Sequence, residues 1–412
     1  MTVLHDIEEI QEKVILVSVE ENPHDDTLEC LKELEELSET AGAIVVGILI
    51  QKREKIHPGT YIGKGKIEEL KELVMEKEAT SVVCDDELSP AQLKNLEEAL
   101  EVKVIDRTVM ILDIFAKHAT TREGKIQVEL AQLKYRSSRL VGLGSSLSRL
   151  GGGIGTRGPG EKKLEMDRRL IRERISVLKR ELEGIKKNRE TARKQRSKNP
   201  VPVVSIVGYT NAGKSTLLNT LTSAGVLEED KLFATLDPTT RNLELDDGQQ
   251  LLLTDTVGFI RKLPHHLIEA FRSTLEEAKY ADIILHVVDC SNPSANVHMH
   301  TVYETLDMLG VGDKPIITAF NKVDKLQEDD ILKDCRADVT VKISAKMQIG
   351  LGELLHQMEE KLKEQKIYVE CVLTYQEAGK IQLIRKYGQL LEEEYRDEGI
   401  YIRGYLPVGI QL

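Results

Sequence analysis

The feature that most constrains the fold is an eight-residue segment that matches the pattern G-x-x-x-x-G-K-S: Gly208-Tyr209-Thr210-Asn211-Ala212-Gly213-Lys214-Ser215. An apolar run at residues 203–207 precedes it and a helical pattern follows, as the motif requires. Its glycines let backbone N–H groups turn inward around phosphate oxygens, and a helix N-terminus adds a favourable field for anions. We expect Lys214 to bridge the terminal phosphates of a nucleotide and the Ser215 hydroxyl to ligate Mg²⁺.

Three further motifs follow in order, each after an apolar run: Asp255-Thr256-Val257-Gly258, Asn321-Lys322-Val323-Asp324 and Ser344-Ala345-Lys346. Asp255 can hold the metal through water, and the Gly258 N–H can sense a terminal phosphate. The Asp324 carboxylate can accept both N1–H and N2–H of guanine, which adenine does not offer, and a backbone N–H in the last motif can donate to guanine O6. Together the motifs predict a GTP-hydrolysing enzyme, with Lys214 and Gly258 as catalytic groups.

A switch segment that completes the metal coordination is expected between the phosphate-binding segment and the Asp255–Gly258 motif. It is the segment Leu232-Phe233-Ala234-Thr235-Leu236-Asp237-Pro238-Thr239-Thr240-Arg241. A threonine here should complete the Mg²⁺ shell when the terminal phosphate is present. Thr235 is the first choice as catalytic and metal-ligating residue, Thr239 or Thr240 is the reserve, and a plain Thr/Pro turn competes with each. Phe259 stands where many GTPases place a water-orienting glutamine, which predicts slow hydrolysis in the protein alone.

Two α/β regions flank a basic segment. Apolar runs at 14–19, 44–50, 81–84 and 102–105 alternate with helical patterns at 27–41, 66–77 and 89–100, which predicts an N-terminal parallel α/β domain over 1–115. Buried-strand runs at 203–207, 251–254, 283–288, 316–320 and 339–343 predict a doubly wound domain over 200–366. A small α+β tail, 367–412, should contain strands near 367–373 and 400–404 and a helix near 376–389, and should pack on a neighbour.

The region 116–199 is expected to form a basic antiparallel helical hairpin with a glycine-rich tip at 142–160. Residues 116–200 hold 23 Lys and Arg against 9 Asp and Glu, whereas the remainder holds 34 against 60. Such one-sided charge favours RNA phosphates over the alternative of a solvated coiled coil. With no Trp and 16 Phe plus Tyr, recognition should be of RNA shape and not of stacked bases. The expected contacts near the tip are Arg149, Arg157, Lys162, Lys163, Arg168, Arg169, Arg172 and Arg174.

Several weaker patterns favour simple structural roles. Asp85-Asp86-Glu87 is interpreted as a strand-end turn, and His298 with His300 is not expected to form a metal pair. Five widely spaced cysteines indicate reduced thiols, and the longest apolar run, 41–50, is too short for a membrane span. These features predict a cytoplasmic location, with peripheral membrane association left open. We also expect a monomer and no DNA partner.

The same motifs resemble those of the HflX translational GTPases over nearly the whole chain. The resemblance rests on 61–66, 106–108, 127–133 and 149–161 in the N-terminal half, and on Phe233-Ala234-Thr235-Leu236-Asp237 and Asp255–Phe259 as switch regions. It implies a GTPase with Mg²⁺ as cofactor that binds the large (50S) ribosomal subunit and its 23S rRNA, splits stalled or idle ribosomes, and is stimulated by them.

Other functions share part of the pattern. A GTPase that assists assembly of the large subunit would carry the same motifs, and a non-hydrolysing RNA-binding scaffold would carry most of them. A small-molecule kinase could use the same phosphate loop, but the guanine-specifying 321–324 motif argues against it.

Overall fold

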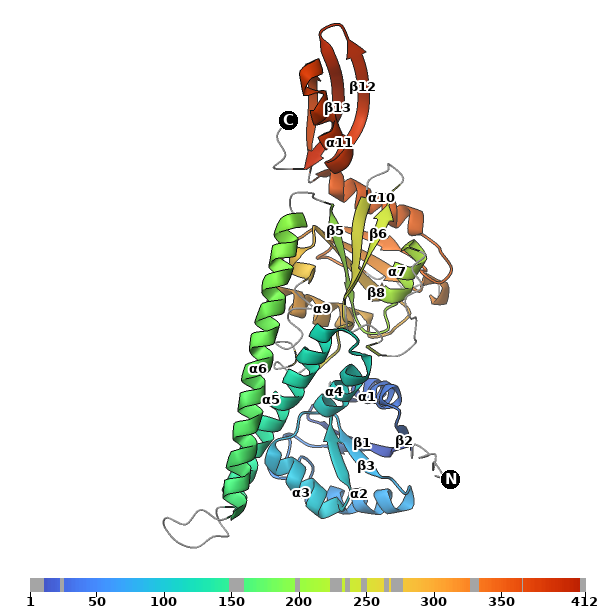
Figure 1. Cartoon of the computed structure of the whole chain (residues 1–412). Helices are drawn as coiled ribbons and strands as arrows, with labels where there is room; N and C mark the ends of the chain where they lie inside the picture. Colours follow the sequence, from blue (N-terminus) through green and yellow to red (C-terminus); the bar gives the residue numbers. More distant parts are fainter. Residues whose placement is uncertain are drawn as a thin grey trace, which may run out of the picture. The chain divides into compact units, whose positions relative to one another are not determined.

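The computed structural model describes residues 11–22, 26–147, 159–196, 201–222, 232–233, 238–245, 250–262, 267, 277–326, 333–364 and 366–407. Contacts divide the chain into two compact units. The first comprises residues 1–183 together with 261–270, and the second comprises 184–260 and 271–412. Each unit has its own sheet and core, so each is described by itself (Figure 1). No helix among the described residues is long and apolar enough to cross a membrane.

The first unit is built on a four-stranded, all-parallel sheet in the order β2-β1-β3-β4. Its apolar core gathers under the strands and includes Ile15, Val17 and Val82, each fully buried. This parallel α/β architecture confirms the fold class expected for this part of the chain. The elements are β1 (Lys13–Glu20), α1 (Thr27–Ala41), β2 (Ile44–Lys52), α2 (Lys64–Glu76), β3 (Ser81–Cys84), α3 (Pro90–Leu100), β4 (Lys103–Asp106) and α4 (Arg107–His118).

Local caps explain where several of these helices begin. At α3, the Ser89 hydroxyl accepts from the Gln92 N–H while the Gln92 side chain accepts from the Ser89 N–H, and Pro90 starts the helix. At α4, the Asp106 carboxylate accepts from the Val109 N–H at 3.0 Å. The last residue of β4 is therefore also the N-cap of α4.

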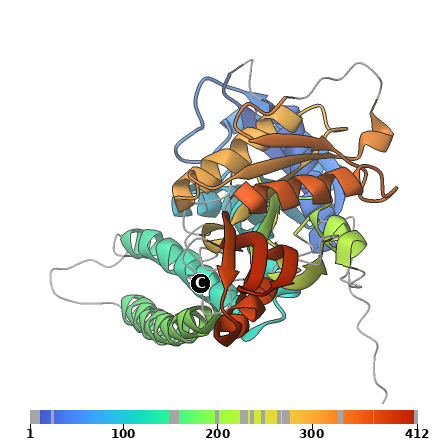
Figure 2. The ribbon, with the colours of Figure 1, turned by 90° about the horizontal axis from the view of Figure 1, so that it is seen from above.

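Two long helices, α5 (Arg122–Leu147) and α6 (Pro159–Arg196), run side by side in Figures 1 and 2. Arg174 makes two hydrogen bonds to Glu129 at 2.7 and 2.9 Å, and Arg122 contacts Glu181 at 3.2 Å. Leu178 of α6 is buried. These contacts describe an antiparallel hairpin.

The hairpin tip differs from its expected extent of 142–160. α5 continues to Leu147, so Gly142 and Gly144 lie inside the helix, and α6 begins at Pro159. Only residues 148–158 of the expected tip fall outside the described residues. Glycine lowers helix stability by about 1 kcal/mol relative to alanine, a cost that a long helix tolerates at isolated positions.

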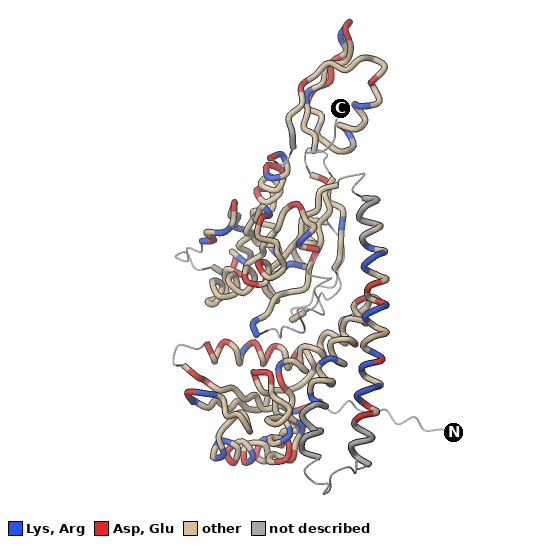
Figure 3. Tube along the Cα trace, turned by 90° about the vertical axis from the view of Figure 1, so that its left-hand side faces the viewer, with Lys and Arg blue, Asp and Glu red and all other residues tan. Residues whose placement is uncertain are grey.

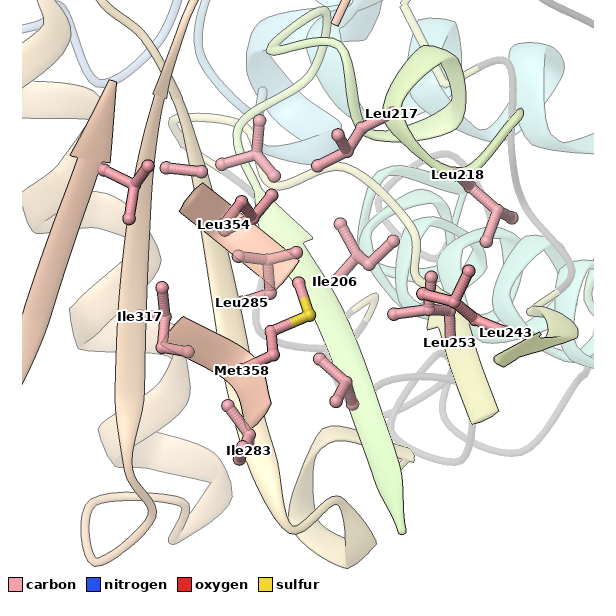
Figure 4. Close-up of a cluster of buried hydrophobic side chains, with 14 of the residues drawn as sticks. Ile206, Leu217, Leu218, Leu243, Leu253, Ile283, Leu285, Ile317, Leu354 and Met358 are labelled. Carbon is pink, nitrogen blue, oxygen red and sulfur yellow. The ribbon is translucent and has the colours of Figure 1, made fainter. Parts of the chain in front are cut away.

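The second unit contains a six-stranded sheet in the order β10-β9-β8-β5-β7-β6, parallel except for β6. Its core packs Ile206, Leu285 and Ile317 of the central strands against Leu217 and Met358 of the helices (Figure 4). The elements are β5 (Val203–Gly208), α7 (Lys214–Thr222), β6 (Thr239–Glu244), β7 (Gln250–Asp255), β8 (Ile283–Asp289), α9 (Ala295–Leu309), β9 (Ile316–Asn321), η2 (Val323–Lys325), β10 (Val339–Lys342) and α10 (Leu351–Glu364). The strand β6 was not expected from the sequence.

The C-terminal segment forms a three-stranded antiparallel sheet, β11-β13-β12, with α11 packed on one face. Ile384, Ile400 and Ile402 are buried in a core cluster of residues from this segment. The expectation that the segment packs on a neighbour stays a prediction. β12 was also unexpected, because its residues lie in the range assigned to the end of a helix and to the loop after it. The elements are β11 (Lys366–Leu373), η3 (Tyr375–Lys380), α11 (Ile381–Tyr387), β12 (Gln389–Arg396) and β13 (Gly399–Pro407).

Candidate active site

The phosphate-binding segment forms a tight turn between β5 and α7. Gly208 has a φ of 157°, and a Cβ atom there would lie 2.3 Å from the Val287 carbonyl oxygen. Gly213 has a φ of 93°, and a Cβ atom there would meet Asn321 Nδ2 at 2.3 Å. Both positions therefore require glycine, because any side chain would collide with a neighbouring strand or with Asn321. The turn leads directly into the N-terminus of α7, which begins at Lys214.

The Lys214 side chain is buried under this turn. Its Nζ donates to the Tyr209 carbonyl oxygen at 2.7 Å. Burial lowers the pKa of Lys214 to about 8, with the Asp255 carboxylate opposing the shift and the Lys322 ammonium adding to it. A compact ammonium in this position can neutralise phosphate oxygens that approach the turn.

Two oxygen ligands meet beside Lys214. The Ser215 hydroxyl at the start of α7 donates to Asp255 Oδ2 at the end of β7, at 2.8 Å. A hydroxyl and a carboxylate are the hard oxygen donors that Mg²⁺ prefers, so this pair fits a magnesium ion bound with a nucleotide. The described part of the chain contains no cluster of three or more His, Cys, Asp or Glu side chains that could hold a metal ion.

The chain after Asp255 is paired directly with the phosphate turn. The Phe259 N–H donates to the Gly208 oxygen at 3.1 Å, and the Thr210 N–H donates to the Phe259 oxygen at 2.8 Å. Gly258 is held so close that a Cβ atom would lie 2.9 Å from Thr210 Cα and 3.1 Å from Lys214 Nζ. The backbone of Gly258 is thus beside Thr210 and Lys214 of the phosphate turn.

Two predicted residues of this motif serve the fold. The Thr256 hydroxyl donates to the Ile206 carbonyl oxygen at 2.8 Å and is fully buried, and Val257 is buried as well. The Phe259 side chain is 2% exposed. It is therefore a core residue that offers no polar group to a substrate.

The guanine-recognition motifs meet at the carboxyl ends of β9 and β10. Asn321 Nδ2 donates to the Ala212 oxygen at 2.9 Å, and Asn321 Oδ1 accepts from the Ala345 N–H at 2.9 Å. One amide therefore ties the phosphate turn to the last motif. The Ser344 hydroxyl donates to Asp324 Oδ1, a hydrogen bond that lowers the pKa of this exposed carboxyl and keeps it ionised to accept from a base.

Lys322 makes a further bracing contact. Its Nζ lies 2.6 Å from Asp289 Oδ2 and donates to the Asn211 oxygen at 2.9 Å. Asp289 ends β8 and was not expected in the site. The signal that could have found it is its position, because the carboxyl ends of neighbouring parallel strands meet at one edge.

Another unexpected contact involves the phosphate turn. The rings of Tyr209 and His298 stack with centroids 3.8 Å apart and planes 5° from parallel. His298 lies on α9, so this ring stack packs α9 against the phosphate turn. His300, two residues later on the same helix, has its Nδ1 3.6 Å from Glu304 Oε1.

The switch segment is described only in part. Phe233 is buried and has a φ of 58°, whereas Ala234, Thr235, Leu236 and Asp237 lie outside the described residues. The reserve threonines belong to β6, where Thr240 Oγ1 is 3.1 Å from Thr254 Oγ1. That contact joins Thr240 to the neighbouring strand β7, and the choice of Thr235 stays a prediction.

The arginines expected to contact RNA differ in their surroundings. Arg169 and Arg172 are exposed on α6, and Arg169 makes a hydrogen bond to Glu173 at 2.8 Å. Arg174 donates to Glu129, and Arg168 donates to the Leu140 oxygen. Because Glu129 and Leu140 belong to α5, these two arginines of α6 also join the two helices. Figure 3 shows Lys and Arg spaced along the long helix. Arg149 and Arg157, and the side chains of Lys162 and Lys163, lie outside the described residues.

The chain just beyond Phe259 and Ile260 enters the first unit, to which residues 261–270 belong by their contacts. Lys262 Nζ lies 2.6 Å from Asp85 Oδ2 and 2.7 Å from Asp86 Oδ1. Although burial opposes the change, the two carboxylates raise the pKa of Lys262. Asp85 is fully buried and also receives Arg107 Nη1 at 2.9 Å, so the interpretation of 85–87 as a mere turn was incomplete.

Comparisons with known proteins match these motifs across most of the chain. Residues 29–116 match the family described as GTP-binding GTPase N-terminal, 118–196 the GTP-binding GTPase middle region, and 203–322 the 50S ribosome-binding GTPase family. The chain is 67% identical to the GTPase HflX of Lacrimispora saccharolytica, covering 99% of this chain and 96% of the relative. It is 42% identical to the GTPase HflX of Escherichia coli, covering 91% and 88%.

A crystal structure of a GTP-binding protein from Sulfolobus solfataricus in complex with GDP is similar at 27% identity and a TM-score of 0.46, covering 85% of this chain and 98% of that one. The family assignment rests on the sequence relatives, which agree with the guanine-nucleotide geometry described above. The chain therefore belongs to the HflX family of GTPases: it hydrolyses GTP, and it carries an N-terminal α/β domain and a P-loop domain of the ribosome-binding GTPase type.

Proposed function

We propose that this protein is a GTP-driven switch that binds the large (50S) ribosomal subunit through its basic hairpin and splits stalled or idle ribosomes. The observation that carries the proposal is the short path from Gly258 to Lys262. Gly258 lies beside Lys214 in the phosphate site, and four residues later Lys262 is ion-paired in the unit that bears the hairpin. A change at Gly258 therefore acts directly on the first unit through the chain.

The nucleotide site supplies the switch. Lys214, Gly258 and Thr235 act on the terminal phosphate, and Ser215 with Thr235 ligates Mg²⁺, which neutralises charge on the phosphates when bound. The phosphate turn, 208–215, the switch residues 233–237 and 255–258, and the base motifs 321–324 and 344–346 bind the nucleotide. Because the two nucleotide states hold Gly258 differently, they can favour different arrangements of the first unit.

The hairpin supplies the ribosome contact. The exposed guanidinium groups of Arg169 and Arg172 can neutralise phosphates of 23S rRNA. The further basic residues proposed for this contact are Arg149, Arg157, Lys162, Lys163, Arg168 and Arg174. The description of the matched family as 50S ribosome-binding supports this partner. The protein acts as a monomer in the cytoplasm without DNA, and its four functional regions are 1–115, 116–199, 200–366 and 367–412.

A charge reversal tests the hairpin contact. The double variant Arg169→Glu/Arg172→Glu should lower co-sedimentation with large subunits at least tenfold and flatten its dependence on salt. The matched control, Lys179→Glu/Lys187→Glu, reverses two exposed charges of the same helix farther from the tip. It should bind more tightly than the Arg169/Arg172 variant. An equal loss of co-sedimentation in the two double variants would show that binding depends on the net charge of the helix and not on Arg169 and Arg172.

Ribosome dissociation separates the remaining functions. Loss of 70S particles in the presence of GTP supports splitting, whereas binding to large subunits without loss of 70S particles supports an assembly role. Single-turnover GTP hydrolysis that large subunits do not accelerate would favour an RNA-binding scaffold.

A further inference from the structure

The hydroxyl of Thr210, the third residue of the phosphate turn, is buried without a hydrogen-bond partner. Thr210 is 6% exposed, and its Oγ1 contacts no donor or acceptor among the described residues. Its backbone N–H is satisfied by the Phe259 oxygen at 2.8 Å, so only the side chain is left over. An unpaired buried hydroxyl costs free energy that valine, of the same shape, would not. The hydroxyl therefore indicates a use other than folding.

The position of Thr210 indicates what that use is. A Cβ atom at Gly258 would lie 2.8 Å from Thr210 Cγ2 and 3.1 Å from Lys214 Nζ, so the three residues meet at one point. Gly258 and Lys214 are the groups that contact a terminal phosphate in this class of enzyme. The Thr210 side chain thus lies beside Gly258 and Lys214 with its methyl group toward Gly258. A change of rotamer about the Cα–Cβ bond brings Oγ1 to the place of the methyl group, at the end of the turn where that phosphate is attacked.

The other polar side chains nearby are already engaged. Thr256 donates to the Ile206 oxygen and Ser215 donates to Asp255. Phe259 occupies the place of a water-orienting glutamine, but its ring is buried in the core. Among the described residues at this end of the turn, the Thr210 hydroxyl is the neutral group that has no hydrogen-bond partner. It can therefore both accept from and donate to a water molecule or a phosphate oxygen.

We propose that Thr210 is a catalytic residue whose hydroxyl positions the attacking water. Oγ1 accepts a hydrogen bond from the water and donates its own proton to a terminal phosphate oxygen, without losing that proton. The water oxygen forms a bond to the terminal phosphorus, and the bond from phosphorus to the bridging oxygen breaks. GDP leaves with the bridging oxygen, and a proton of the water passes to a terminal phosphate oxygen and leaves with inorganic phosphate. The hydroxyl orients the water and is not a general base, because an alcohol is far too weak an acid to ionise here.

Two substitutions in the full chain separate the hydroxyl from the shape of the side chain. Thr210→Val removes the hydroxyl and keeps the volume, whereas Thr210→Ser keeps the hydroxyl and removes the methyl group that faces Gly258. The measurements are single-turnover hydrolysis of saturating Mg²⁺–GTP without ribosomes, affinity for fluorescent GDP, and the thermal unfolding midpoint. Ribosomes are left out, so the result does not depend on the proposed ribosome function.

We expect Thr210→Val to lower the hydrolysis rate constant at least tenfold, with affinity for GDP within twofold of the parent and an unfolding midpoint no lower. Thr210→Ser should hydrolyse GTP within threefold of the parent rate. Parental hydrolysis by Thr210→Val would overturn the proposal. So would an equal loss of rate in both variants, or a loss of GDP affinity that matches the loss of rate, since either result assigns Thr210 to the shape of the turn.

Discussion

The ammonium of Lys262 lies 2.6 Å from the fully buried carboxylate of Asp85. Asp85 follows β3, and Lys262 lies 177 residues later, just after the second nucleotide motif at 255–258. Asp86 adds a second contact to the same ammonium at 2.7 Å. The chain that leaves the phosphate site is therefore fixed to the carboxyl edge of the N-terminal sheet by charge.

Lys262→Met should destabilise the first unit. The substitution leaves Asp85 with Arg107 as its remaining cation and removes one hydrogen bond from each of two carboxylates. Because the Lys262 side chain is 39% exposed, solvent reduces the cost to about 1–2 kcal/mol. Thermal unfolding should show a midpoint lower by about 2–6 °C.

Lys71→Met is the matched control for that change. Lys71 pairs with Glu101, which is largely exposed, so its loss should leave the midpoint nearly unchanged. If both variants unfold at the same temperature, the contact between Lys262 and Asp85 does not fix the segment.

Ser215→Ala should raise the magnesium requirement. The substitution removes the Ser215 hydroxyl, which contacts Asp255. Of this pair of oxygen groups, only the Asp255 carboxylate is then left for Mg²⁺. We expect the Mg²⁺ concentration for half-maximal GTP hydrolysis to rise at least tenfold, measured by titration at saturating GTP. Ser215→Thr keeps the hydroxyl and should retain the parental requirement. A parental titration curve for the alanine variant would remove Ser215 from the metal site.

Affinity for GTP should fall as the pH rises through about 8. Burial lowers the pKa of Lys214 to about 8, so the free protein holds a phosphate-binding ammonium below that pH and loses it above. Phosphates favour the charged form, so binding weakens up to tenfold per pH unit between the pKa of the free protein and that of the complex. Equilibrium binding from pH 7 to 9 tests this, with guanosine, which has no phosphate, as the control. Parallel profiles for GTP and guanosine would contradict the assignment.

Asp324→Asn should change base selectivity. The carboxylate can accept two hydrogen bonds from guanine, and the Ser344 hydroxyl keeps it ionised, since this hydrogen bond lowers its pKa. We expect affinity for GDP to fall at least tenfold and affinity for xanthosine diphosphate to rise, because an amide can donate to the second carbonyl of xanthine. Competition against fluorescent GDP measures both. The exposed Asp313→Asn serves as control, and equal losses for both nucleotides would reject the role of Asp324.

The buried elements of the fold were predictable from sequence, and the exposed edges were not. α1 (Thr27–Ala41) has the expected bounds because its apolar residues follow a helix period, and β3 (Ser81–Cys84) has them because it is a short, continuous buried run. β6 and β12 are edge strands of their sheets with many exposed side chains, so no alternation marks them. In β12, three consecutive glutamates from Glu392 further obscure the pattern.

The nucleotide site was predictable where its residues are contiguous. The phosphate turn and the base motifs depend on short spacings that can be read along the chain. The contacts of Asp289 with Lys322, His298 with Tyr209 and Lys262 with Asp85 join distant segments and leave no local signature. The unpaired Thr210 hydroxyl could be recognised only once the packing around it was known.

The most direct test of the account is sedimentation of the protein with ribosomes in the presence of a non-hydrolysable GTP analogue or of GDP. We predict that the protein migrates with large subunits in the analogue state, that 70S particles decrease there, and that both effects are at least tenfold weaker with GDP. Equal binding in the two nucleotide states, or no binding in either, would contradict the claim that nucleotide occupancy controls a ribosome-binding hairpin.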